Sequence, residues 1–253
     1  MRLALIGYGN VGKAFARLLE RQRAAFPFRI VGIHTARHGS AFDQRGLPLE
    51  PAFGPAVAPI GEFLDRARPE VAMEITSLEP ATGEPAISYI RACFERHKHV
   101  VTANKGPIAH AYSALRREAA QAGVQFRFES TVMDGAPVFN MVRNNLPGVK
   151  IQGFTGVLNS TTKIVIEAMR QGRTMEDGVE EARRLGITET DASFDIDGWD
   201  SATKTAALAN VLLDANATPL DVDRRGIGRV TPEKVEGLAR QGKTICLVSR
   251  ARR

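Results

Sequence analysis

An aspartate and a lysine four residues apart form the pair in this sequence with the clearest potential for chemistry. Asp200 and Lys204 share one face if residues 201–213 form the helix that their apolar periodicity predicts. On an exposed helix, such a pair is only a weak surface salt bridge. Residues 205–209 read Thr-Ala-Ala-Leu-Ala, however, which indicates a largely buried helix. A buried lysine beside carboxylates is a tunable proton donor, so Lys204 is predicted to be catalytic.

A second lysine, Lys105, follows Asn104 in the segment 101–106, directly after a predicted strand. Reduction of a carbonyl group requires a hydride at the carbon and a proton, or at least a positive charge, at the oxygen. A lysine can supply either the proton or the charge. The segment 101–106 and the acidic run 189–204 are therefore the two candidates for a site of carbonyl and alcohol chemistry.

A glycine-rich run at residues 7–12, Gly-Tyr-Gly-Asn-Val-Gly, indicates a dinucleotide site. The first glycine permits a tight turn, the second lets a pyrophosphate approach the backbone, and the third lets helix and strand pack closely. The run begins where a predicted strand ends and opens a predicted helix, whose N-terminus faces the phosphates in such sites. A plain glycine turn is the alternative. The predicted cofactor-binding residues of the run are Gly7, Gly9, Asn10, Val11 and Gly12.

The end of the second predicted strand bears on the choice between NAD and NADP. NAD enzymes usually carry an acid there that binds the ribose 2′-hydroxyl, whereas residues 34–38 of this chain read His-Thr-Ala-Arg-His. Arg37, with His38 or Arg45 nearby, is suited to binding the 2′-phosphate of NADP. NADP is therefore the preferred prediction. The alternative is that Arg37 is a solvated loop charge and that NAD is the cofactor.

Alternating strands and helices position these segments in the first half of the chain. The predicted strands span residues 2–6, 28–34, 70–76, 100–101 and 124–128, and the predicted helices span residues 11–23, 85–96 and 109–122. The apolar face of the first helix is assigned to Val11, Phe15, Leu18 and Leu19. This alternation predicts an α/β fold of the Rossmann type, a doubly wound parallel sheet that covers residues 1–130.

Longer helices replace this pattern from about residue 131 onward. They are predicted over residues 161–170, 175–184 and 201–213, between isolated strands at residues 149–154 and 243–249. The second domain, residues 131–253, is therefore predicted to be an α+β lobe that binds the substrate.

The composition of the 253 residues is that of an ordinary globular protein, with 43% hydrophobic and 25% charged residues. No apolar run approaches the ~20 residues of a membrane span, so no membrane partner is expected. The formal charge of +6 suits anionic partners, but basic and acidic residues are interleaved and no nucleic-acid-binding module is visible, so no nucleic acid is expected. Cys93 and Cys246 lack metal or disulfide spacing, which favours a reducing cytoplasm.

Five segments together resemble the homoserine dehydrogenase family: residues 7–12, 104–105, 132–137, 156–162 and 189–204. The resemblance spans nearly the whole chain. The glycine run is generic, whereas the Asn-x-Thr-Thr of residues 159–162, followed by the Gly-Ile-Thr-Glu of residues 186–189 and the acidic run, is specific. The resemblance implies reversible, NAD(P)H-dependent reduction of L-aspartate 4-semialdehyde to L-homoserine, in threonine and methionine biosynthesis.

The resemblance also implies roles for individual residues. Lys204 would be the proton donor to the aldehyde oxygen, and Lys105 would lie near the nicotinamide and the substrate and share that role. Glu189, Asp195 and Asp200 would hold the substrate ammonium group and the catalytic lysine. The other implied contacts are Gly156 and Thr161 to the substrate, and Thr76, Asn104 and Lys105 to the cofactor.

Residues 129–136 resemble the alkali-cation loop of the family, in which backbone carbonyl groups bind Na⁺ or K⁺. The implied positions are Glu129, Val132, Asp134 and Ala136. Carbonyl ligands leave no side-chain signature, so an ordinary strand-to-helix turn is the alternative. The second lobe resembles the dimerisation region of the family, which implies a homodimer that acts on a small-molecule substrate.

Most members of the family continue past the stretch that matches residues 248–253, and some carry a regulatory ACT domain. We expect this chain to be a short form without that domain, shortened at its C-terminus, with a less covered cofactor cleft and slower turnover. Two alternatives to homoserine dehydrogenase activity stay open. One is a related dehydrogenase of another small amino or oxo acid, and the other is a degenerate NADP-binding homologue or sensor without turnover.

Overall fold

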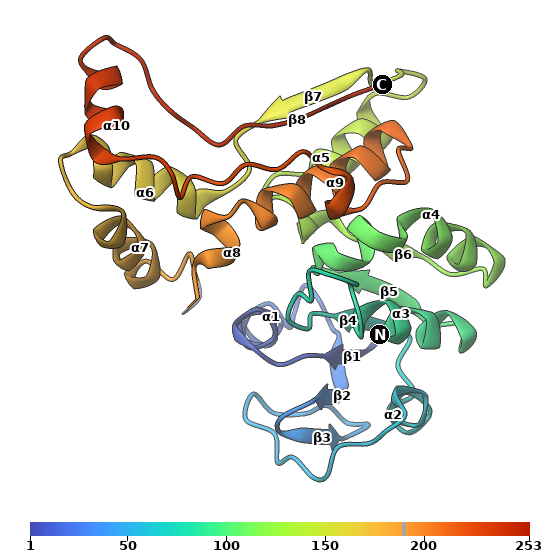
Figure 1. Ribbon diagram of the computed structural model, residues 1–253. Coiled ribbons are helices and arrows are strands. Elements are labelled where there is room, and N and C mark those ends of the chain that lie inside the picture. Colours follow the sequence, from blue (N-terminus) through green and yellow to red (C-terminus); the bar gives the residue numbers. More distant parts are fainter. Residues whose placement is uncertain (189–190) are drawn as a thin grey trace. The chain divides into compact units, whose positions relative to one another are not determined.

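A six-stranded sheet organises the first part of the chain (Figure 1). Its strands are β1 (Arg2–Ile6), β2 (Arg29–Thr35), β3 (Gly39–Phe42), β4 (Val71–Glu74), β5 (His99–Thr102) and β6 (Phe126–Arg127). They lie in the order β3-β2-β1-β4-β5-β6, and every neighbouring pair is parallel except β2 and β3. The order reverses beside β1, which creates the switch point where doubly wound sheets bind nucleotides. This computed structural model confirms the predicted Rossmann-type α/β fold.

Helices cover both faces of this sheet (Figure 1). The helices of this unit are α1 (Asn10–Arg21), α2 (Ile60–Ala67), α3 (Ala86–Glu95), α4 (Lys105–Gln121) and the short α5 (Val138–Asn140), with a 3-10 turn η1 (Glu129–Thr131) and a π-helical turn η2 (Met141–Asn145). Ile33 of β2 shares a core with Ala16 of α1. The next residue, His34, packs its ring 5.3 Å from the ring of Phe63 in α2. Because successive side chains of a strand point to opposite faces, α1 and α2 lie on opposite sides of the sheet.

The predicted apolar face of α1 is wrong in part. Val11 and Leu18 are 59% and 46% exposed, whereas the buried residues of the helix are Gly12 and Ala16. The helix packs on the sheet through these small residues, so a count of large apolar side chains misplaces its buried face. The strand β3 and the helix α2 were not predicted, since both are short and lie in a segment rich in glycine and proline.

The second part of the chain is mainly helical. Its elements are β7 (Gly153–Gly156), α6 (Ser160–Arg170), α7 (Met175–Arg184), α8 (Ser193–Ile196), α9 (Trp199–Leu213), η3 (Pro219–Asp221), α10 (Pro232–Ala239) and β8 (Ser249–Arg252). Helix α6 packs against α7 and α10, and β7 pairs with β8 in antiparallel fashion (Figure 1). A core of Val165, Met169 and Val235 joins α6 to α10. The helices at residues 161–170, 175–184 and 201–213 are confirmed.

Both predicted strands of this second part are misplaced. The strand expected at residues 149–154 is found as β7 at Gly153–Gly156, and Val149 is 55% exposed. The strand expected at residues 243–249 is found only as β8, from Ser249 onward. Ile245 and Leu247 instead pack against the core beneath α6. An extended segment that covers a core shows the same alternation of apolar residues as a strand.

The structure describes residues 1–188 and 191–253, which divide into two compact units, Met1–Asn145 and Leu146–Arg253. The functional boundary expected after residue 130 stays a prediction. Among the described residues, no helix is both long enough and apolar enough to cross a membrane.

Candidate active site

The turn between β1 and α1 needs a glycine at its first position. Gly7 has φ +108°, and a Cβ atom there would lie 2.5 Å from the carbonyl oxygen of Ile75. At Gly12, a Cβ atom would lie 3.1 Å from Cδ1 of Ile75 and 3.2 Å from the carbonyl oxygen of Gly7. The first glycine thus permits the turn, and the third permits the close approach of α1 to the sheet.

The second glycine of the run leaves open space above the backbone. Gly9 is the N-cap residue of α1, and a Cβ atom there would have no neighbour within 4 Å. Asn10 and Val11, in the first turn, are exposed, and among the described residues no side chain caps this end of the helix. Backbone N–H groups at an uncapped helix N-terminus favour a phosphate. The residues present therefore fit the pyrophosphate of a dinucleotide.

The carboxyl ends of β1, β4 and β5 meet at one edge of the sheet. The pairing register places Ile6 beside Glu74 and Glu74 beside Thr102. The residues that follow these strands, among them Thr76 and Asn104, therefore lie together at the switch point. This is the edge at which the glycine turn also lies, because Gly7 directly follows β1.

Asn104 and Lys105 begin α4 at this edge. The Oδ1 atom of Asn104 accepts a hydrogen bond of 3.0 Å from the backbone N–H of Gly106, and its Nδ2 atom lies 3.4 Å from Oγ1 of Thr76. Lys105 is half-buried at the first position of the helix. The structure thus brings together Thr76, Asn104 and Lys105, three predicted cofactor residues from two different loops.

Arg37 lies in the short turn between β2 and β3, and its side chain is exposed. His38, beside it, packs its ring 5.9 Å from that of Phe53. Arg45 lies after β3 and forms an exposed ion pair with Asp43, with 3.6 Å between Nε and Oδ1. Arg37 is therefore positioned beyond the end of β2, where doubly wound enzymes recognise the adenosine ribose.

In the second unit, Lys204 and Asp200 form a buried ion pair. The Nζ atom of Lys204 lies 2.9 Å from Oδ2 of Asp200, and the two side chains are only 17% and 10% exposed. Lys204 also donates a hydrogen bond of 2.8 Å to the carbonyl oxygen of Leu158. This burial excludes the alternative of a solvated surface salt bridge.

Asn159 links this pair to a second carboxylate. Its Oδ1 atom caps α6 by accepting a hydrogen bond of 2.7 Å from the N–H of Thr162, which fixes the orientation of the amide. Its Nδ2 atom donates to Oδ1 of Asp195 at 2.5 Å and to Oδ2 of Asp200 at 2.9 Å. The other oxygen of Asp195 accepts a hydrogen bond from the hydroxyl group of Thr188.

The role of Asn159 was not predicted from the sequence. Asn159 lies three residues after the end of β7 and directly before α6, where an asparagine is an expected helix cap, so the sequence gives no sign of its contacts with two carboxylates. The remaining predicted substrate residues are near it in sequence: Gly156 ends β7, and Thr161 is buried in the first turn of α6. Glu189 lies outside the described residues.

The carboxylate of Glu129 has a structural task. It accepts hydrogen bonds from the backbone N–H groups of Phe139 and Asn140, at 2.9 and 3.0 Å, and thereby holds the start of α5. The other residues of the predicted cation loop are Val132, which is buried, Asp134, which is exposed, and Ala136, which is half-buried. In the described residues, no group of three His, Cys, Asp or Glu side chains could hold a metal ion. An alkali cation on carbonyl oxygens stays a prediction.

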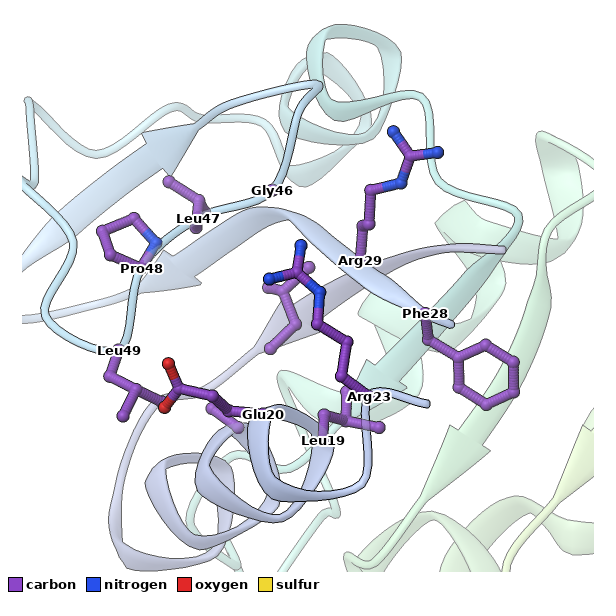
Figure 2. A pocket seen from close by; sticks show the side chains of 11 residues that line it. Leu19, Glu20, Arg23, Phe28, Arg29, Gly46, Leu47, Pro48 and Leu49 are labelled. Carbon is purple, nitrogen blue, oxygen red and sulfur yellow. The ribbon is translucent and has the colours of Figure 1, made fainter. Parts of the chain in front are cut away.

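A surface pocket of about 250 Å³ lies elsewhere on the first unit. Figure 2 shows that it is lined by α1, the start of β2 and the segment 46–49, with Arg23 and Arg29 among its walls. Arg29 stands at the amino end of β2, whereas the glycine turn follows the carboxyl end of β1. The pocket is therefore separate from the candidate nucleotide site.

The switch point of the sheet, with a glycine turn shaped for a pyrophosphate, places the chain among the NAD(P)-dependent dehydrogenases. Comparison with known proteins identifies the family within this class. Residues 7–129 match the family model described as "Homoserine dehydrogenase, NAD binding domain", and residues 137–252 match the model described as "Homoserine dehydrogenase".

Individual relatives match over nearly the whole chain. A homoserine dehydrogenase of Methanocaldococcus jannaschii is 35% identical over 98% of this chain and 80% of its own length. An NAD(+)-dependent homoserine dehydrogenase of Pseudomonas canavaninivorans is 36% identical over 100% of this chain and 77% of its own. The crystal structure of the homoserine dehydrogenase of Thermoplasma acidophilum has a TM-score of 0.83 at 26% identity, over 99% of this chain and 78% of that one. The chain therefore belongs to the homoserine dehydrogenase family, whose members are NAD(P)-dependent oxidoreductases that act on a CH–OH group.

Proposed function

We propose that the chain interconverts L-aspartate 4-semialdehyde and L-homoserine, with NAD(P) as the cofactor. The observation that carries this proposal is the buried pair of Lys204 and Asp200, tied to Asp195 through Asn159, in a member of this family. A charged network inside a helical unit is costly to bury, and catalysis of a polar reaction is a reason to keep it.

The cofactor is held by the first unit in this proposal. Gly7, Gly9 and the first turn of α1 receive the pyrophosphate, while Thr76 and Asn104 contact the nicotinamide half. When bound, the nicotinamide supplies the hydride that reduces the aldehyde, or accepts the hydride that homoserine gives up. Lys105, at the start of α4, adds positive charge at the same edge of the sheet.

In this proposal, Lys204 is the general acid and, in the reverse direction, the general base. Its ammonium group donates a proton to the aldehyde oxygen as the carbonyl carbon becomes tetrahedral, and takes that proton back in the reverse direction. Asp200 and the carbonyl oxygen of Leu158 hold the Nζ atom in place, so the proton is delivered from a fixed position.

The carboxylates of the second unit suit the other end of the substrate. Homoserine and its aldehyde both carry an α-ammonium group, and Asp195 presents a half-buried carboxylate oriented by Asn159 and Thr188. We assign Asp195, together with Asp200 and Glu189, to this ammonium group, and Gly156 and Thr161 to the substrate backbone. A hydrophobic pocket could not select an amino acid in this way.

The test of the proposed function is the absorbance of reduced nicotinamide when purified protein is mixed with L-homoserine and NADP⁺ or NAD⁺. We expect the absorbance to rise when L-homoserine is added and to stay unchanged when D-homoserine is added. Binding of the cofactor without any rise from L-homoserine would instead favour a sensor without turnover. The family match and the intact Lys204 and Asp200 argue against that second reading.

Cofactor preference gives a separate prediction. If Arg37 binds the 2′-phosphate, then Arg37→Ala should raise the Kd for NADPH about tenfold and leave the Kd for NADH unchanged, since one charge-assisted hydrogen bond at an exposed site is lost. Fluorescence titration with each reduced cofactor measures both constants. The matched control is Arg21→Ala, which removes an arginine at the end of α1 that is farthest from the glycine turn. A wild-type protein that binds NADH more tightly than NADPH would contradict the preference, and one relative is named as NAD(+)-dependent.

The proposal also includes a homodimer in the cytoplasm that serves threonine and methionine biosynthesis, and an alkali cation on the carbonyl groups of residues 129–136. The homodimer is inferred from the resemblance of the second lobe to the dimerisation region of the family. Light scattering of the purified protein measures the oligomeric state directly.

A further inference from the structure

A carboxylate that the catalytic proposal does not use lies beneath the switch point. Glu74 is the last residue of β4, and only 1% of it is exposed. Among the described residues it forms no ion pair with a lysine or an arginine. Within the described part of the chain, the charge of Glu74 acts on Tyr89 and Cys93, both in α3, and neither of these side chains carries a positive charge.

The two oxygens of Glu74 hold two different loops. One oxygen, Oε1, accepts hydrogen bonds from the backbone N–H of Thr76 at 2.9 Å and from the hydroxyl group of Thr76 at 2.5 Å. The other, Oε2, accepts a hydrogen bond of 2.7 Å from the hydroxyl group of Thr102. The hydroxyl oxygen of Thr102 in turn accepts the backbone N–H of Asn104 at 2.9 Å. One carboxylate thus fixes the loop after β4 and the loop after β5.

Stability alone does not explain a buried carboxylate that has no positively charged partner among the described residues. Burial raises the pKa of Glu74 above its usual value, because the desolvated carboxylate loses its hydration, although the hydrogen bonds from Thr102 and Thr76 act in the opposite direction. An apolar residue at the end of a buried strand would pack without this cost. The hydrogen bonds are therefore better explained by the loops that they place.

The strand order of the sheet indicates which half of a dinucleotide the loops after β4 and β5 would bind. In a doubly wound sheet, one mononucleotide lies over the strands on one side of the switch point and the second lies over the strands on the other side. Here the adenosine side is β1 and β2, with the glycine turn and Arg37, and the other side is β4 and β5. Thr76 and Asn104 follow β4 and β5.

We propose that Glu74 is a positioning residue for the nicotinamide half of the cofactor site, an inference that rests on the proposed use of NAD(P). Through Thr76 and Thr102 it holds the two loops in the arrangement that receives the nicotinamide nucleotide. Glu74 does not touch the reacting atoms. The adenosine half of the site is independent of it.

Calorimetric titration of Glu74→Gln tests this division. NADPH probes both halves of the site, and adenosine 2′,5′-bisphosphate probes the adenosine half alone; NADH and AMP replace them if NADH binds more tightly to the wild type. The amide replaces an acceptor of the network with a donor, so we expect the Kd for NADPH to rise about tenfold and the Kd for the bisphosphate to stay within about twofold.

Variants of Thr102 keep the test decisive if Glu74→Gln fails to fold. Thr102→Val is nearly isosteric but removes the hydroxyl group, and Thr102→Ser keeps it. The valine variant is expected to weaken NADPH binding and the serine variant to restore it. Glu118→Gln, which neutralises a half-buried carboxylate paired with Arg91, serves as the control for loss of charge.

The melting temperature separates positioning from a purely structural role. A carboxyl group whose pKa is raised by folding stabilises the protein at pH values below its ordinary pKa, and this contribution is lost as the pH rises through the folded-state pKa. At mildly alkaline pH, the hydrogen bond that Glu74→Gln loses is offset by removal of a costly buried charge, so its melting temperature should stay close to that of the wild type. Equal weakening of both ligands with a lower melting temperature would overturn the proposal, as would unchanged NADPH binding or a wild type that binds no cofactor. Cofactor binding without homoserine turnover would overturn only the proposed function.

Discussion

Lys204→Ala is expected to lower kcat by about 100-fold or more, since loss of a positioned general acid typically costs that much or more. The cofactor Kd should be unchanged, because the glycine turn belongs to residues 1–145 and Lys204 belongs to residues 146–253. The fold should also persist, since Asp200 still accepts a hydrogen bond from Asn159 when the lysine is removed. Initial rates with saturating L-homoserine and a cofactor titration measure the two effects.

A conservative variant distinguishes the proton from the charge. Lys204→Arg keeps a positive group in contact with Asp200, but a guanidinium group does not release its proton at ordinary pH. If proton transfer is the task of Lys204, the arginine variant should be nearly as slow as the alanine variant. Lys163→Ala, an exposed lysine on α6, should keep wild-type rates. A Lys204→Ala enzyme with near wild-type kcat would contradict the assignment and direct attention to Lys105.

Local sequence patterns predicted the parts of the fold that depend on local physics. The glycine run predicted its turn because a positive φ at Gly7 and close packing at Gly12 are demands of a few adjacent residues. The pair of Asp200 and Lys204 was predictable for the same reason, since their spacing alone places them on one helical face. Burial of that helix followed from its small apolar residues.

Features that depend on residues distant in sequence were not predictable in this way. Glu74 reads as a charged residue at the end of a strand, and only the pairing of β4 with β5 brings it to the hydroxyl group of Thr102. Asn159 reads as a helix cap, and its contacts with Asp195 and Asp200 cross more than thirty residues of chain. Ile245 and Leu247 alternate as in a strand, although they pack on a helical core.

Gly7→Ala is expected to raise the cofactor Kd by about 100-fold or more and to lower the melting temperature of the first unit. The added Cβ atom would lie 2.5 Å from the carbonyl oxygen of Ile75, and φ at this position is +108°. A methyl group at such a distance must displace either the turn or the strand end, so the phosphate-binding backbone moves with it. Titration with reduced cofactor and a thermal melt measure the two effects.

Two other glycines make this prediction specific. Gly9→Ala adds a methyl group with no neighbour within 4 Å and with φ at −81°, so the protein without cofactor should melt like the wild type, whereas a pyrophosphate that occupies this space should be excluded. Gly237→Ala, on α10, also meets nothing within 4 Å and should bind cofactor normally. Loss of binding in Gly9→Ala without loss of stability would locate the phosphate at this turn. Wild-type binding by both Gly7→Ala and Gly9→Ala would show that the dinucleotide binds elsewhere.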